Sequence, residues 1–132
     1  MPETRPDRAA AVDALDEALR AEGTPERAEQ EKRYLESALH HHGVTVPATR
    51  RLLKVWRAGR PRFDRTTLRG FVDEAWSRRV HELRFTAVEQ LVDDVALLER
   101  DDFSWLEQLL REPGTWALVD PLATRRAAPR RP

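Results

Sequence analysis

The feature that most constrains the fold is a helical pattern of apolar residues between positions 64 and 77. Apolar side chains recur there at positions i, i+3, i+4, i+7 and i+8. They are Leu68, Phe71, Val72, Ala75 and Trp76. This spacing puts all five on one face of an α-helix. The segment therefore predicts an amphipathic helix that packs against other helices.

Helix-boundary residues divide the rest of the chain into further helices. Thr24-Pro25 and Thr45-Val46-Pro47 each supply an N-cap and a proline suited to the first helical turn. We expect helices over about 9–21, 24–42, 45–58, 64–77, 80–92, 102–110 and 115–120. The second of these carries Tyr34, Leu35, Ala38 and Leu39 on one stripe and stops at Gly43.

These short helices with short connectors predict the fold class. No run of alternating β-branched residues indicates a sheet, so we expect an all-α protein. Antiparallel pairs of amphipathic helices are typical of an α-helical hairpin array. The last segment, 124–132, has no apolar face and is expected to be a disordered basic tail.

Composition limits the functional class. The 132 residues include no cysteine, which excludes disulfides and thiolate chemistry. No apolar stretch indicates a signal peptide or a membrane span, so a cytoplasmic location is expected. The net charge is zero, but residues 32–86 hold 13 basic against 5 acidic side chains, a net of +8. This basic segment is either a phosphate-contacting surface or a solvated arginine-rich surface.

Within the basic segment, Arg50, Arg51, Lys54 and Arg57 form a cationic strip over two helical turns. Arg50, Lys54 and Arg57 share one face, which can follow a phosphate backbone or simply be solvated.

The run of three histidines at 40–42 cannot share one helix face. It is therefore a poor metal site and fits better at a helix C-terminus, where we expect it. Near the start of the helix at 80–92, Glu82 and Arg84 are expected to brace neighbouring helices.

Two residues near the end of the chain suggest a ligand site. Trp116 and Asp120 are four residues apart, so in a helix they lie on one face. An aromatic ring and a carboxylate together suit a planar cation. The alternative is a core tryptophan followed by a solvated aspartate.

Three segments resemble the AlkD-like family of DNA alkylation repair enzymes, which are built of HEAT-like helical repeats. The first comprises Lys32–Ser37 and Gly43–Lys54, with an Arg-Tyr pair, a glycine, a helix-opening proline and two basic residues. The second is His81–Leu91, and the third is Trp105–Leu109 leading to Trp116–Asp120. The resemblance covers about residues 28–123.

The resemblance implies a glycosylase that excises N3- or N7-alkylated purines from double-stranded DNA without a cofactor or metal. It places Trp116 against the sugar of the lesion and gives Asp120 the role of stabilising the oxocarbenium-like sugar. It places Tyr34 near the DNA backbone and matches Arg50 and Arg51 to a basic pair on the next helix. Together with Lys54 of the cationic strip, these residues are expected to hold phosphates. The domain expectation is an acidic helix at 1–23, a HEAT-like repeat domain at 24–123 and the tail at 124–132.

Family members continue through further repeats, whereas here the Arg/Pro/Ala tail follows Ala123. We therefore expect a truncated HEAT-like solenoid, weakly active or inactive, whose exposed C-terminal edge could self-associate. The alternative is a non-catalytic helical-repeat module that binds DNA or protein.

Overall fold

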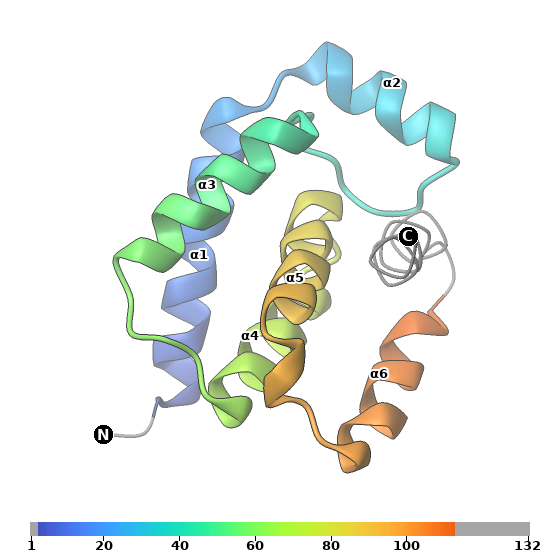
Figure 1. The fold of residues 1–132 in the computed structure, drawn as a ribbon. Helices are drawn as coiled ribbons and strands as arrows, with labels where there is room; N and C mark the ends of the chain where they lie inside the picture. Colours follow the sequence, from blue (N-terminus) through green and yellow to red (C-terminus); the bar gives the residue numbers. More distant parts are fainter. Residues whose placement is uncertain (1–2, 113–132) are drawn as a thin grey trace, which may run out of the picture.

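The computed structural model describes residues 3–112, which form helices joined by short connections (Figure 1). The α-helices are α1 (Arg5–Glu22), α2 (Pro25–Leu35), α3 (Val46–Ala58), α4 (Arg65–Ser77), α5 (His81–Asp93) and α6 (Phe103–Leu110). Two 3₁₀ turns, Val95–Leu97 and Arg100–Asp102, connect α5 to α6. Residues 3–112 contain no strand, so the all-α prediction is confirmed, and the arrangement is consistent with a helical repeat array.

Side-chain caps fix where the first four helices begin. Thr4, Thr24, Thr45 and Asp64 each accept a hydrogen bond from the backbone N–H three residues later. Such a cap satisfies a donor that the helix itself leaves free. The starts predicted at Thr24, Thr45 and Asp64 are therefore confirmed.

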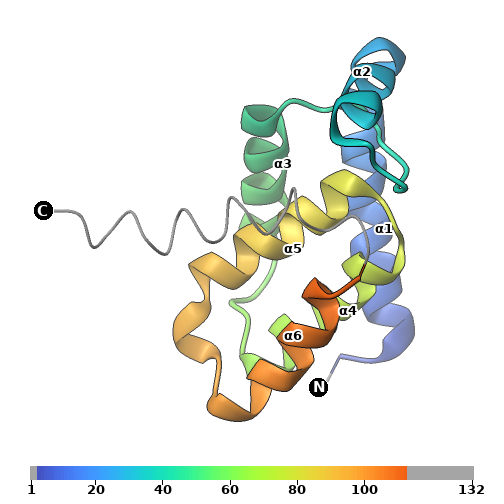
Figure 2. The ribbon, with the colours of Figure 1, turned by 90° about the vertical axis from the view of Figure 1, so that its right-hand side faces the viewer.

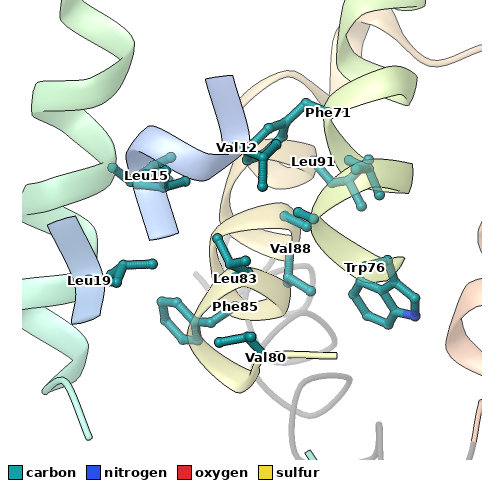
Figure 3. Close-up of a cluster of buried hydrophobic side chains, with 14 of the residues drawn as sticks. Val12, Leu15, Leu19, Phe71, Trp76, Val80, Leu83, Phe85, Val88 and Leu91 are labelled. Atoms are coloured by element: carbon teal, nitrogen blue, oxygen red, sulfur yellow. The ribbon is translucent and has the colours of Figure 1, made fainter. Parts of the chain in front are cut away.

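The core lies where α1, α4 and α5 meet. Figure 3 shows Leu15 and Leu19 of α1 gathered with Trp76 of α4 and with Leu83 and Val88 of α5. α4 and α5 pack closely and are joined only by residues 78–80, while α3 packs on both α1 and α5. Figure 2 shows α6 beside α4, and its Trp105 donates a hydrogen bond to Asp73 of α4 at 2.6 Å.

The connection between α2 and α3 is held on α5 by one buried carboxylate. Glu82, which is 1% exposed, accepts backbone hydrogen bonds from His42, Gly43 and Val44 at 2.9, 3.0 and 3.1 Å. Arg84, equally buried, donates to the backbone oxygen of Trp76 at the end of α4. The prediction that this pair braces neighbouring helices is confirmed for Arg84, which joins α5 to α4, whereas Glu82 braces the α2–α3 loop.

The predicted extent of the second helix was wrong. α2 ends at Leu35 because Glu36 adopts the left-handed conformation (φ 50°), so Ala38 and Leu39 lie in the following loop. The histidine run lies in that loop too, not at a helix C-terminus. His40 instead exchanges backbone hydrogen bonds with the turn before α5, donating to Arg79 at 3.0 Å and accepting from His81 at 2.8 Å.

α2 stands apart from the other helices at the top of Figures 1 and 2. It contributes no buried residue, and Tyr34 near its end is 86% exposed. The helix is attached through its ends and through polar contacts of the following loop. Gly43 lies tightly against the start of α2: its φ of 81° and a Cβ that would lie 2.1 Å from the Thr24 carbonyl oxygen require glycine there.

Candidate nucleic-acid interface

The predicted cationic strip lies on α3, on the side turned away from the core. α3 buries Thr49 and Leu53, and Trp56 packs partly against the core. The Trp56 ring also donates a hydrogen bond to the carbonyl oxygen of Ala11 at 2.9 Å, which fixes the rotation of α3 against α1. Arg50, Lys54 and Arg57 occupy positions of α3 between these inward-facing residues, as the helical spacing predicted.

Two of the strip's arginines reach across to α5. Arg50 donates from Nε and Nη2 to Oε1 of Glu89, at 3.2 and 3.0 Å, and its guanidinium lies over the Phe85 ring. Arg57 donates to Asp93 at 3.2 Å. Both arginines therefore face the same neighbouring helix, and the surface between α3 and α5 carries both signs of charge.

Arg51 points in another direction from Arg50. Its Nη2 donates to Glu22 at the end of α1, at 2.9 Å. Sequence reasoning treated Arg50 and Arg51 as one basic pair, but adjacent residues on a helix do not share a face. The structure assigns them to different neighbours, α5 and α1.

Lys54 lies between Arg50 and Arg57 in the strip, and its side chain is exposed. It forms no salt bridge with any residue in 3–112. Its ammonium group is therefore the member of the strip with no competing carboxylate in the described part of the chain. Tyr34 is also solvent-exposed, but it stands on α2, away from this strip.

A second charged cluster fixes the end of α6. Glu112 accepts hydrogen bonds from the Trp76 indole at 3.2 Å, from Arg84 at 3.0 Å and from Arg79. The pKa of Glu112 lies below its usual value, because burial raises it but the hydrogen bonds and positive charges of Arg84 and Arg79 lower it more. This cluster therefore holds the chain against the α4–α5 turn four residues before Trp116.

Trp116 and Asp120, the predicted catalytic pair, lie outside the described residues, as do the helix expected at 115–120 and the tail at 124–132. The described part brings Arg50, Lys54 and Arg57 together on one surface and leaves Tyr34 elsewhere. Sequence reasoning did not find Glu89 and Asp93 as partners of the strip. Their spacing of four residues on α5 was visible, but the register between α3 and α5 was not.

Comparison with known families identifies the chain. It matches the family model described as DNA alkylation repair enzyme over residues 15–129. The chain belongs to this family. The match spans α1 to α6 and includes Tyr34, the α3 strip, Trp116 and Asp120. No curated protein matches the chain.

Membership of the DNA alkylation repair family makes this a DNA alkylation repair protein and suggests DNA as its partner. Among residues 3–112, none of the helices has the length and apolar character needed to cross a membrane.

Proposed function

We propose that this protein is a DNA glycosylase that excises N3- or N7-alkylated purines from double-stranded DNA. The observation that carries the proposal is the family match over residues 15–129, because it includes both members of the aromatic–carboxylate pair. Trp116 and Asp120 are the residues that we assign to the lesion. A cationic purine is the ligand that such a pair favours.

The chemistry follows from the charge of the lesion. Alkylation at N3 or N7 puts a positive charge on the purine and weakens its bond to C1′ of the sugar. When that bond breaks, its electron pair leaves with the base, and positive charge develops on the sugar. The Asp120 carboxylate stabilises this charge, and water then adds at C1′ and loses a proton to the solvent. Electrostatic stabilisation of this kind is often the largest catalytic contribution.

DNA contact is assigned to the α3 strip and to Tyr34. Lys54 contacts a phosphate directly, because no carboxylate in the described part of the chain competes for it. Arg50 and Arg51 contribute through the parts of their side chains that their carboxylate partners leave exposed; Arg50 is 50% exposed and Arg51 58% exposed. Phosphate contacts position a protein on the duplex without reading its sequence.

The test is release of 7-methylguanine from methylated duplex DNA by the full chain. Asp120→Asn keeps the shape of the side chain but removes its charge, and we expect it to lower the rate by roughly a hundredfold or more. Asp101→Asn, at an exposed position in the 3₁₀ turn, is the matched control and should keep the wild-type rate. No release by the wild-type chain above the no-protein background would refute the glycosylase assignment.

A second candidate is a non-catalytic module that binds DNA or protein. The observation that favours it is the mixed charge of the α3 surface, where Glu22, Glu89 and Asp93 already pair with the arginines. Duplex binding that depends on Lys54, combined with no base release, would select this alternative. Lys54→Ala should then weaken binding and reduce the salt slope by about one phosphate contact, whereas Arg100→Ala, exposed on the 3₁₀ turn, should not.

A further inference from the structure

All four histidines of the chain gather where the α2–α3 loop meets α1 and α5. They form two separate sets. His42 contacts Asp16 at 2.7 Å through Nε2 and His40 at 3.2 Å through Nδ1, so both of its ring nitrogens are engaged. The second set is His41, His81 and Glu31, and the proposed DNA chemistry does not use it.

One oxygen of Glu31 faces both rings of the second set. Oε1 lies 2.8 Å from Nδ1 of His41 and 4.0 Å from Nε2 of His81. Candidate ligand atoms of the three residues all lie within 4.8 Å of one another. The other oxygen, Oε2, lies 3.6 Å from the guanidinium of Arg27. Glu31 thus presents one oxygen to the histidines while an arginine holds the other.

We propose that Glu31, His41 and His81 bind a divalent transition-metal ion, with Zn²⁺ as the best-suited ion. Two imidazole nitrogens and one carboxylate oxygen form a donor set typical of zinc, with further positions left for water. Imidazole donors disfavour Mg²⁺ and Ca²⁺, which prefer oxygen ligands. Arg27 remains on Oε2 and orients the carboxylate, as groups beyond the direct ligands do in metal sites.

Coordination requires one ring to turn. The His41 and His81 rings are stacked, with centroids 4.4 Å apart and planes 12° from parallel. A metal ion lies in the plane of each imidazole that binds it, so two parallel rings cannot share one ion. His81 is the ring that turns, because its side chain is 15% exposed whereas that of His41 is 1% exposed. His41 also borders an open cavity of about 610 Å³.

The site would join three segments that are distant in the sequence. Glu31 lies on α2, His41 in the loop, and His81 at the start of α5. Since α2 contributes no buried residue, an ion held between these segments would fix α2 on the rest of the protein. Metal binding to the folded state alone adds to stability by mass action.

The test is titration of the untagged full chain with ZnCl₂ by calorimetry, and with Co²⁺ by its visible d–d absorption. We expect one ion per chain, and a dissociation constant raised at least ~100-fold in His81→Ala, since loss of a direct ligand should cost no less than loss of an outer-shell partner. Glu31→Gln, which keeps the side-chain shape, should also weaken binding. His40→Ala is the matched control, because His40 is an exposed histidine of the other set.

A second measurement follows hydrogen exchange of the α2 amides with and without Zn²⁺. Protection should increase in the wild type and in His40→Ala, but not in His81→Ala. Absence of Zn²⁺ binding by the folded wild-type chain would overturn the proposal. Equal binding by wild type and His81→Ala would also overturn it, as would loss of binding in His40→Ala, which would assign the ion to the histidine run itself.

Discussion

The carboxylate of Glu82 should stabilise the protein more than most single side chains, and Glu82→Gln tests this directly. The side chain is 1% exposed and accepts three backbone hydrogen bonds, one on Oε1 and two on Oε2. A glutamine has almost the same shape but only one accepting oxygen. If that oxygen takes the place of Oε2, the new NH₂ group faces the N–H of His42, donor against donor.

The magnitude follows from the groups left without partners. Hydrogen bonds to charged acceptors contribute about 1.5–3 kcal/mol each, and an unsatisfied buried donor costs about 1–3 kcal/mol. These two energies partly describe the same lost interaction, so they are not simply added. We expect a loss of about 3 kcal/mol in the free energy of unfolding. This is a large part of the roughly 5–15 kcal/mol typical of a domain. The corresponding decrease in Tm is about 10 °C.

The assay is urea unfolding of the full chain at pH 7, followed by tryptophan fluorescence and circular dichroism. Glu17→Gln is the matched control, since Glu17 is exposed on α1, and it should stay within about 0.5 kcal/mol of wild type. The m-value should be unchanged, which shows that the variant unfolds from the same compact state. A Glu82→Gln loss no larger than that of Glu17→Gln would refute the role assigned to the three hydrogen bonds.

Three further predictions concern other sites. Gly43→Ala should lower the free energy of unfolding by roughly 3 kcal/mol or more in the same denaturation assay, because the new Cβ would lie 2.1 Å from a backbone oxygen. Gly59→Ala is the control and should be tolerated, because the nearest atom to its Cβ is 3.9 Å away. The hydrogen bond from Arg65 lowers the pKa of Asp102 to about 2, so the stability that ionised Asp102 contributes is present above pH ~4 and lost as the pH falls towards 2. Unfolding measured against pH should show this loss of stability in the wild type. Asp102→Asn, already destabilised, should lose less stability over the same pH range. Asp93→Asn releases Arg57 from its ion pair and should tighten duplex DNA binding, with a salt dependence steeper by about one phosphate contact. An unchanged salt dependence would contradict a phosphate role for that side of α3.

The helix starts could be predicted because they depend on local chemistry. Thr24, Thr45 and Asp64 cap their helices through hydrogen bonds that span only three residues, so the sequence near each cap contains the whole signal. The same holds for the buried face of α4. The family resemblance likewise depended on short segments, and the match over residues 15–129 confirms it.

The end of α2 could not be predicted, because its cause is distant. Ala38 and Leu39 continue the helical spacing, and Glu36 is neither glycine nor asparagine, the usual residues for a left-handed helix end. The path of the loop depends instead on Glu82, whose carboxylate binds backbone groups some forty positions earlier in the chain. The pairing of Arg50 with Glu89 was hidden for the same reason, since it depends on how two helices align.

Glu82 also connects the fold to the proposed DNA interface. Comparing its loss with the loss of Lys54 therefore distinguishes a residue that positions the interface from one that contacts DNA. The loop that it holds follows α2, which carries Tyr34, and directly precedes Thr45, which caps the helix carrying Lys54. Releasing the loop should therefore weaken DNA binding and stability together. Removing the Lys54 ammonium should weaken DNA binding alone, because that side chain is exposed and unpaired within residues 3–112. A Lys54→Ala chain that lost stability in proportion to DNA affinity would mean that α3 contributes to DNA binding through its packing and not through its charge.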